Sequence, residues 1–322
     1  MVRTVLITGA AGMVGSHLTE ALAATADTAV IATFHAPTIR PAELAALPVP
    51  LVPLDVRDRT AVSALIARAR PDVIHHLAAQ SLPTLSWSDP WATMDANVTG
   101  TINVFEAVRA VRRTDPGYDP IVVVACSSAQ YGASLLAATG PVGEDTAFLP
   151  LHPYGVSKVA QDLLAFQYSR NDGIRAVRAR IFNCTGPRKR ADVVSDFCAR
   201  VAALTRSGAR RGTLRVGNLT TRRAILDVRD LVSALTLLAA HGASEAYNIG
   251  AAEALPIGDL IPLLSELSSI ELEPEPDPAL MRPSDEPLIL GDTARLRAVT
   301  GWTQRRTIGE TVRAVYEHEC AA

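Results

Sequence analysis

A tyrosine and a lysine stand four residues apart in the segment Tyr154-Gly155-Val156-Ser157-Lys158. Four residues make roughly one turn of a helix, so the phenol and the ammonium are expected to share one helix face. A cation beside a phenol favours the phenolate, and it lowers the pKa of the tyrosine from about 10 towards neutrality. The pair could therefore act as a general acid or base. A surface stack on an amphipathic helix is the simpler alternative.

Glycines at positions 9, 12 and 15 follow a short strand pattern at residues 4–7 and precede a helical pattern. We expect Gly9 to permit a sharp turn and Gly12 to let the backbone approach a pyrophosphate at the helix N-terminus. Gly15 would let the helix and the strand pack closely. In this strand–turn–helix context, the GxxGxxG spacing predicts a dinucleotide site.

The second predicted strand, residues 29–33, bears on the choice between NAD and NADP. An NAD enzyme usually ends this strand with an acid that binds the ribose 2′-hydroxyl, but here the strand ends at Thr33 without one. This favours NADPH, with His35 or Arg40 available to a 2′-phosphate. After the third strand, Asp55 is expected to accept a hydrogen bond from the adenine amino group, to cap the next helix, or to do both.

Strand and helix patterns alternate through the first half of the chain. Apolar runs at 73–78 and 121–125 fit parallel strands buried on both faces, and helices are expected near 91–112 and 153–170. These βαβ units predict an α/β fold with a Rossmann-type doubly wound parallel sheet, whose ligands bind beyond the carboxyl ends of the strands. Polar residues follow three of those ends: Ala79-Gln80-Ser81, Ser127-Ser128 and Asn183.

The second half of the chain predicts a smaller, mixed α/β substrate lobe. Residues 273–278 are acidic and rich in proline, so we expect turns and no helix there. We expect a dinucleotide-binding domain at 1–182 plus about 224–250, and a nucleotide-sugar-binding lobe at 183–223 and 251–322.

The composition is that of an ordinary globular protein, with 48% hydrophobic and 20% charged residues. A formal net charge of −2 gives no support for binding nucleic acid or a membrane. No apolar run reaches transmembrane length, and Met1 leads directly into a strand. The four cysteines (Cys126, Cys184, Cys198 and Cys320) lack metal-ligand spacing and look like reduced thiols. We expect a cytoplasmic protein without a bound metal.

With the glycine turn, Ser127 and the Tyr154/Lys158 pair, the chain resembles the extended short-chain dehydrogenase/reductases that act on nucleotide-diphosphate sugars. The resemblance covers essentially the whole length. Two segments match the family: Ser127-Ser128-Ala129-Gln130-Tyr131-Gly132 and Arg180-Ile181-Phe182-Asn183-Cys184-Thr185-Gly186-Pro187. Four more resemble the branch of GDP-mannose 4,6-dehydratase and GDP-6-deoxy-4-keto-mannose reductase: Gly217-Asn218-Leu219, Asp227-Val228-Arg229-Asp230, Arg282-Pro283-Ser284-Asp285 and Thr300-Gly301-Trp302.

The resemblance implies proton exchange at the sugar O4. Tyr154 would carry the proton, Ser127 would hydrogen-bond the same oxygen, and Lys158 would hold the nicotinamide ribose. The alternative for Ser127 is a hydroxyl that only satisfies backbone groups at the strand end. The positions implied for the cofactor are Gly9, Gly12, Met13, Val14, Gly15, Thr33, His35, Asp55, Val56, Leu77, Ala78, Ala79, Asn97, Tyr154, Lys158 and Ile181. Those implied for the substrate are Gln80, Ser81, Ser128, Asn183, Val194, Arg223, Arg282 and Asp285.

Departures from the family pattern bear on the reaction. A 4,6-dehydratase needs a carboxylate two residues before Tyr131, where this chain has Ala129, and this argues against dehydration. The chain also reads Arg223-Ala224 where the family often has Arg-Asp. We expect reduction of a nucleotide-linked 4-keto sugar by NAD(P)H. The alternatives are a 4-epimerase of a nucleotide-linked hexose or heptose that retains NAD, and a non-catalytic nucleotide-binding regulator.

The expected partners are a nucleotide-diphosphate sugar, with GDP favoured as the nucleotide, and a second copy of the chain. In related enzymes the helices near 91–112 and 153–170 pair across a homodimer interface. The apolar side chains Val159, Leu163 and Phe166 could equally be intramolecular core.

Overall fold

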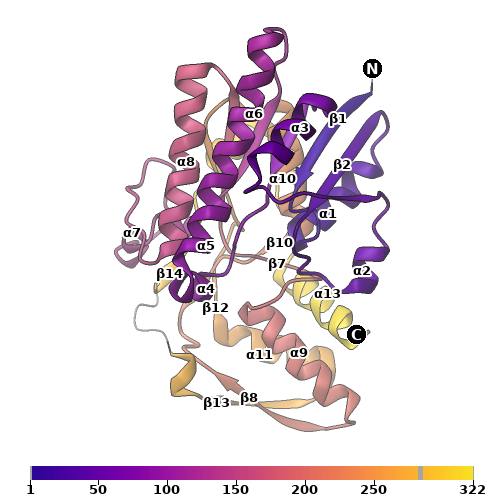
Figure 1. Cartoon of the computed structure of the whole chain (residues 1–322). Coiled ribbons are helices and arrows are strands. Elements are labelled where there is room, and N and C mark those ends of the chain that lie inside the picture. The colour runs from indigo at the N-terminus through magenta and orange to yellow at the C-terminus, as the bar shows by residue number, and fades with distance from the viewer. Residues whose placement is uncertain (1, 282–285, 322) are drawn as a thin grey trace.

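A seven-stranded parallel sheet forms the centre of the fold (Figure 1). The computed structural model describes residues 2–281 and 286–321, so the expected ligand residues Arg282 and Asp285 lie outside the described residues. The strand order is β11-β6-β5-β4-β1-β2-β3, which confirms the predicted doubly wound sheet. Its strands are β1 (Arg3–Thr8), β2 (Thr28–Phe34), β3 (Leu51–Pro53), β4 (Val73–His76), β5 (Ile121–Ser127), β6 (Arg175–Ile181) and β11 (Ala246–Ile249).

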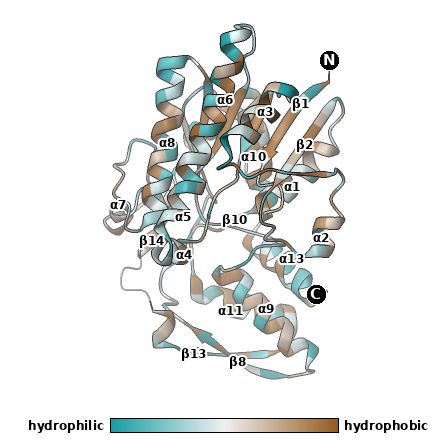
Figure 2. Ribbon diagram, viewed as in Figure 1, coloured by the Kyte–Doolittle hydropathy of each residue, from teal (hydrophilic) through white to brown (hydrophobic). Residues whose placement is uncertain are grey.

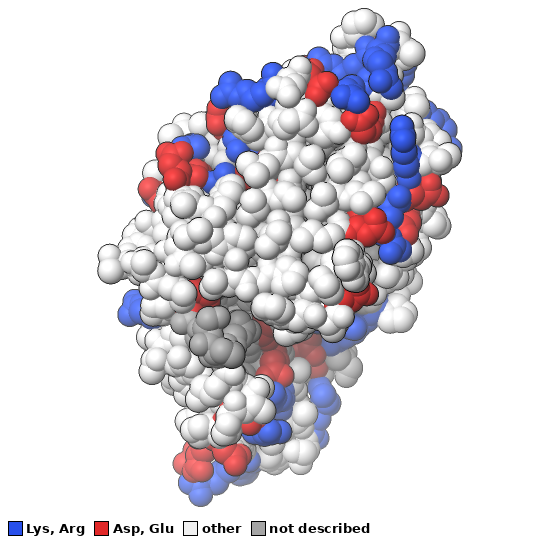
Figure 3. Space-filling model, turned by 60° about the vertical axis from the view of Figure 1, so that its left-hand side comes forward, with Lys and Arg blue, Asp and Glu red and all other residues white. Residues whose placement is uncertain are grey.

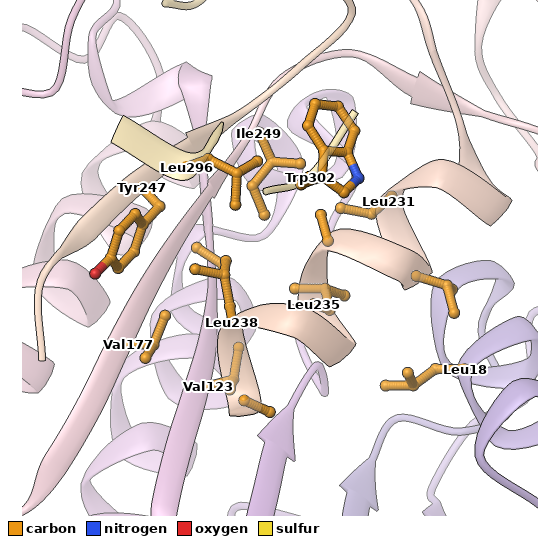
Figure 4. Close-up of a cluster of buried hydrophobic side chains, with 14 of the residues drawn as sticks. Leu18, Val123, Val177, Leu231, Leu235, Leu238, Tyr247, Ile249, Leu296 and Trp302 are labelled. Atoms are coloured by element: carbon orange, nitrogen blue, oxygen red, sulfur yellow. The ribbon is translucent and has the colours of Figure 1, made fainter. Parts of the chain in front are cut away.

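Both faces of the sheet are buried by helices, which explains the continuous apolar run at 121–125. Successive side chains of β5 enter different clusters: Val123 faces one side of the sheet, and Val122 and Val124 face the other. On the first side, Leu231 and Leu235 of α10 (Val228–His241) lie in the cluster that Figure 4 shows. Helix α1 (Met13–Ala23) joins this side, while α3 (Arg59–Ala69), α6 (Gly100–Thr114) and α8 (Pro153–Asp172) cover the other. The apolar strands stand out between these helices in Figure 2.

The helix expected near 91–112 consists of three consecutive segments. They are α5 (Pro90–Met94), a π-helical segment η1 (Asp95–Thr99) and α6. A π-helical segment has one extra residue per turn, so it changes which side chains of the stretch face α8. Other elements in this half of the chain are α2 (Pro41–Ala45), α4 (Pro83–Ser88), the 3₁₀ turn η2 (Ser128–Gln130) and α7 (Ala133–Leu136).

A separate apolar cluster lies below the sheet in the view of Figure 1, among α9 (Val193–Arg206), α11 (Leu260–Ser268), α13 (Ile308–Cys320), β8 (Arg211–Val216) and β13 (Glu271–Pro276). Residues 224–250 belong to the sheet half of the molecule: β11 is a strand of the sheet, and α10 packs against one of its faces. The remaining elements are β7 (Cys184–Thr185), β9 (Arg222–Arg223), β10 (Leu226–Asp227), β12 (Leu255–Pro256), η3 (Ile257–Asp259), η4 (Pro278–Leu280), β14 (Leu288–Ile289) and α12 (Ala294–Thr300). The domain boundaries expected from the sequence stay a prediction.

The sequence predicted turns in the proline-rich stretch at 273–278, and this prediction was wrong for most of it. Most of it belongs to β13, which pairs in parallel with β8. The Glu271 N–H donates to the carbonyl of Arg210, the residue before β8, and the Asp277 N–H donates to the carbonyl of Val216, the last residue of β8. A parallel ladder uses alternate N–H groups, so Pro274 and Pro276 occupy positions from which no donor is needed.

The segment Asp227-Val228-Arg229-Asp230 has a structural role. The Asp227 carboxylate caps α10 by accepting from the Arg229 N–H at 2.8 Å, and it also accepts from the Thr311 hydroxyl of α13 at 3.0 Å. Asp230 accepts the N–H groups of Arg305 and Arg306. The two aspartates therefore attach the carboxyl-terminal segment and α13 to the start of α10.

All four cysteines are free thiols. Within the described residues, no helix is both long enough and apolar enough to cross a bilayer.

Candidate active site

Ser127, Tyr154 and Lys158 come together at the carboxyl end of β5. Ser127 is the last residue of this strand, and Tyr154 lies in the first turn of α8. A hydrogen bond joins the side chains of Ser127 and Tyr154. The Lys158 Nζ atom lies 5.6 Å from the centroid of the Tyr154 ring and donates to the Ala125 carbonyl at 2.7 Å. The three residues predicted to act together thus form one cluster.

Burial dominates the ionisation of this cluster, which corrects the expectation that Lys158 lowers the pKa of Tyr154. Tyr154 is 9% exposed and Lys158 is 3% exposed. Burial raises the pKa of Tyr154 to about 12, although its hydrogen bond with Ser127 acts in the opposite direction. Burial also lowers the pKa of Lys158 to about 8. A low-dielectric site disfavours the charged form of both groups, but at neutral pH only Tyr154 is neutral, because the lowered pKa of Lys158 still lies above 7.

The first turn of α8 is fixed by a histidine that the sequence did not single out. The His152 Nδ1 atom accepts the Gly155 N–H at 3.0 Å and caps the helix, and Pro153 occupies its first position. The His152 ring stacks on Tyr154 with the ring centroids 5.9 Å apart. At Gly155, a Cβ atom would lie 2.7 Å from the Ala129 carbonyl oxygen, so the turn after β5 can approach α8 only at a glycine.

Asn97, expected at the cofactor, instead binds other parts of the protein. Its side chain is fully buried within the π-helical segment. The Oδ1 atom accepts the Gln80 N–H at 2.8 Å, and Nδ2 donates to the Gln80 carbonyl at 3.0 Å and to the Ser157 hydroxyl at 2.8 Å. The Gln80 amide in turn donates to Leu82 and Thr93. We therefore assign Asn97 and the Gln80 side chain to holding the loop after β4 against α8.

The glycine turn fits a bound pyrophosphate. Gly9 has φ +76°, and a Cβ atom on Gly15 would lie 2.2 Å from the Gly9 carbonyl oxygen. The residue at the N-cap of α1 is Gly12, which has no side chain to accept a hydrogen bond from the first turn of the helix. The N–H groups of the first turn, which begins at Met13 and Val14, thus lack a side-chain cap, as an anion site at a helix N-terminus requires.

The end of β2 departs from the sequence expectation in two ways. The Thr33 hydroxyl is buried and donates to the Ile7 carbonyl, so it does not face a cofactor. Arg40 donates to the Glu319 carboxylate at 2.8 Å, because α13 lies against α2. His35 remains exposed.

A second basic side chain, Arg57, stands beside His35. It donates to the Asp55 carboxylate at 2.7 Å and to the His35 ring nitrogen at 3.3 Å. The hydrogen bond from Arg57 lowers the pKa of Asp55 to about 2. Asp55 does not cap the next helix, because Asp58 is the cap of α3. The Asp-x-Arg spacing was the sequence signal for Arg57.

The residues expected to bind the substrate differ in how far their side chains are exposed to solvent. Ser81 is exposed, and Asn183 is half-buried after β6. Arg223 is 8% exposed, and its guanidinium donates to the Glu286 carbonyl at 2.6 Å. The Val194 side chain is buried in the apolar cluster below the sheet, so only its backbone could meet a ligand.

The remaining expected residues lie near the strand ends. Ser128 is buried within η2, and Val56 is buried against Gly100. The N–H groups of Leu77 and Ala78 donate to the Thr8 hydroxyl, which fixes the chain beyond β4. Ala79 and Ile181 are half-buried beyond β4 and at the end of β6.

No cluster of potential metal ligands occurs among residues 2–281 and 286–321. Among the described residues, one surface hollow lies between α1 and α10, and another lies along α13 and reaches Arg229 of α10. Neither is lined by Ser127, Tyr154 or Lys158, so we locate the chemistry from the geometry of these side chains.

Comparison with known proteins gives one consistent result. A family model described as GDP-mannose 4,6 dehydratase matches residues 6–315. GDP-6-deoxy-D-mannose reductase of Pseudomonas aeruginosa is 33% identical over 316 residues, 98% of this chain and 96% of the relative. The solved structure of RMD from Pseudomonas aeruginosa complexed with NADPH covers 99% of both chains, with TM-score 0.83 and 29% identity. UDP-glucose 4-epimerase of Thermus thermophilus complexed with NAD also covers 99% of both, with TM-score 0.82 and 26% identity.

Proposed function

Because the chain belongs to the GDP-mannose 4,6-dehydratase family, we propose that it is an NAD(P)H-dependent reductase acting at C4 of a nucleotide-diphosphate 4-keto sugar. The observation that carries the proposal is the buried Ser127–Tyr154–Lys158 cluster, with a phenol that stays protonated at neutral pH. Reduction of a ketone needs a proton donor at the carbonyl oxygen. At neutral pH Tyr154 is in the protonated form, which is the form that can donate this proton.

Each residue of the cluster has a distinct task. When bound, the nicotinamide cofactor supplies the hydride that is added to the sugar C4. Tyr154 donates a proton to O4, and the Ser127 hydroxyl orients that oxygen by a hydrogen bond. Lys158 would hold the nicotinamide ribose hydroxyls, and the N–H groups after Gly12 would hold the pyrophosphate.

The chain lacks the group that dehydration would require. Ala129, half-buried in the turn after β5, stands where the dehydratase pattern has a carboxylate. Without a base at that position, proton abstraction from C5 has no catalyst there. Membership of the family therefore does not extend to its dehydratase activity.

We infer a GDP-linked 4-keto-6-deoxy sugar as the substrate, supported by the relative that is a GDP-6-deoxy-D-mannose reductase. Asn183 and Arg223 are the described side chains assigned to the nucleotide diphosphate, because a planar guanidinium matches phosphate oxygens. NADPH is the preferred cofactor, supported by the absence of an acid at the end of β2 and by the relative complexed with NADPH. We place the reaction in the cytoplasm, where free thiols such as the four of this chain persist.

We also propose a homodimer that forms through α6 and α8. Leu163 and Phe166 are not intramolecular core, since they are 51% and 40% exposed on α8. Val156 and Trp91 are exposed on α8 and α5, and the side of the molecule with α8 shows few charges across its middle (Figure 3). Leu163→Glu should give a monomer in analytical ultracentrifugation. Val299→Glu, a change at an exposed apolar residue of α12, should leave the dimer intact.

Two measurements test the reductase assignment. Purified protein should consume NADPH when a GDP-4-keto-6-deoxyhexose is added, and the product should be the corresponding 6-deoxy sugar nucleotide. The second measurement is identification of the nucleotide released on denaturation. Stoichiometric bound NAD, with interconversion of 4-epimers and no net consumption of cofactor, would establish the epimerase instead, as in the structural relative complexed with NAD.

A further inference from the structure

A fully buried carboxylate lies between two arginines on the side of α8 that faces the sheet. Asp162 accepts hydrogen bonds from Arg180 at 2.8 and 3.2 Å and from Arg178 at 3.2 Å, both from β6. Burial raises the pKa of Asp162, but the hydrogen bonds and charges of its partners bring it below its usual value. The carboxylate is therefore ionised. A buried charge of this kind holds its partners in one arrangement, because any displacement leaves it unpaired.

Asp162 shares a helix face with the catalytic candidates. It follows Tyr154 by eight residues and Lys158 by four, which is close to two turns and one turn of a helix. The ion pairs with β6 therefore fix how α8 is rotated about its own axis and where it lies along β6. The phenol and the ammonium project from the same face of this helix.

Gln130 connects this carboxylate to the strand end that carries Ser127. Its Nε2 donates to the Asp162 Oδ2 at 3.0 Å, and its Oε1 accepts the Ser127 N–H at 3.4 Å. Gln130 is fully buried, and it ends the 3₁₀ turn that Ser127 caps. A single side chain thus joins the turn after β5 to the anchored face of α8.

We propose that Gln130 is a positioning residue that holds the Ser127 hydroxyl against the Tyr154 phenol by tying the Ser127 turn to Asp162. The inference rests on the proposed function, since reduction at C4 is what requires the two hydroxyls to meet at one oxygen. Ser127 and Tyr154 belong to different elements, and no other described side chain hydrogen-bonds to both Asp162 and the backbone of the turn. The contact between the two hydroxyls depends on this link.

Tyr131 provides a matched control within the same network. Its side chain is also fully buried, and its hydroxyl accepts from Arg180 at 3.0 Å and donates to Asn248 of β11 at 2.7 Å. These bonds lead away from Ser127, towards the edge of the sheet. Removing the hydroxyl therefore disturbs the buried network without loosening the Ser127 turn.

The test compares Gln130→Met, which keeps the side-chain volume but removes both hydrogen bonds, with Tyr131→Phe. For Gln130→Met we expect kcat to fall roughly tenfold or more with KM for the sugar unchanged, because misplacement by about 1 Å can lower turnover about 100-fold. Tyr131→Phe should lose thermal stability but keep kcat. Equal kcat values for the two variants and the wild type would overturn the inference.

A crystal structure of Gln130→Met separates this inference from the proposed function. The Ser127–Tyr154 hydrogen bond should be broken in Gln130→Met and intact in Tyr131→Phe, whatever substrate the enzyme uses. An intact bond in Gln130→Met contradicts the positioning role. Absence of any reductase activity in the wild type contradicts the proposed function and leaves the structural comparison decisive for Gln130.

Discussion

Replacing the buried Lys158 should make the protein more stable. Burial lowers the pKa of Lys158 from its ordinary value of 10.5 to about 8, a difference that corresponds to roughly 3 kcal/mol, since each pKa unit is worth about 1.4 kcal/mol. At neutral pH the wild type therefore folds with an ammonium in an unfavourable site. Lys158→Met removes that charge, which stabilises the folded state. It also removes the hydrogen bond to the Ala125 carbonyl, and this loss costs about 1–2 kcal/mol of the gain. The net gain is about 2 kcal/mol, or a rise in Tm of about 3 °C for a chain of this length.

The gain should also depend on pH in a defined way. The folded protein binds the Lys158 proton more weakly than the unfolded chain, so the unfolded chain holds more protons between about pH 8 and 10.5. The stability contribution of this group rises with pH in that window, and Lys158→Met lacks the rise. Calorimetric Tm values from about pH 7 to 10 should show the advantage of the variant shrinking above about pH 8.

Lys189, the other lysine of the chain, supplies the control. Lys189→Met, which changes a half-buried side chain in the loop before α9, should not reproduce the gain in Tm. A Lys158→Met protein that is no more stable than the wild type at pH 7, or whose advantage persists undiminished at high pH, refutes the argument from burial.

Three further substitutions test other parts of the site. Tyr154→Phe should reduce turnover by roughly 10² to 10⁴, with an unchanged fold by circular dichroism, because it removes the proton donor. Gly15→Ala should destabilise the protein by about 1–3 kcal/mol in urea unfolding and weaken dinucleotide binding, because the new Cβ would lie 2.2 Å from the Gly9 carbonyl oxygen. Gly140→Ala is the neutral control, since a Cβ at Gly140 would meet nothing within 4 Å. Asp162→Asn should lower the free energy of unfolding by about 3–5 kcal/mol, because it leaves buried guanidinium groups without their counter-charge.

Local patterns predicted that Ser127, Tyr154 and Lys158 come together. The apolar run of β5 fixed a strand buried on both faces, and Ser127 stands where that run ends. The four-residue spacing of Tyr154 and Lys158 placed both on one face of α8. These features depend on residues close in sequence. The geometry of a parallel sheet then predicts that the side chains meet beyond the carboxyl ends of the strands.

Features that depend on distant residues could not be predicted in the same way. The sequence offered Arg40 as an alternative to His35 for a 2′-phosphate, and it could not reveal that Arg40 pairs with Glu319, 279 positions later in the chain. Asn97 lies in a π-helical segment that no local pattern indicated, and its amide is saturated by the Gln80 backbone and Ser157. Residues 273–276 form a strand only because β8 lies beside them.

The sign of the Tyr154 pKa shift was missed for a related reason. The sequence reveals the neighbouring cation, but it does not reveal that both groups are buried, and burial is the larger effect. The chemical consequence is that the neutral phenol is the dominant form of Tyr154 in the neutral range. Reduction, in which the phenol gives its proton away, uses the form that the structure favours.

This consequence can be measured through the pH dependence of the two directions of the reaction. Between about pH 5 and 7, where Lys158 keeps its charge, the phenol is fully protonated, so kcat/KM for reduction of the 4-keto sugar should be nearly constant. Oxidation of the product sugar by NADP⁺ needs the phenolate, a minor form at these pH values, so its kcat/KM should rise about tenfold per pH unit. A tyrosine with a pKa lowered below about 5 would reverse the pattern: reduction would fall about tenfold per unit and oxidation would be flat. That reversed profile would mean that a bound ligand, or the ammonium of Lys158, outweighs the burial of Tyr154.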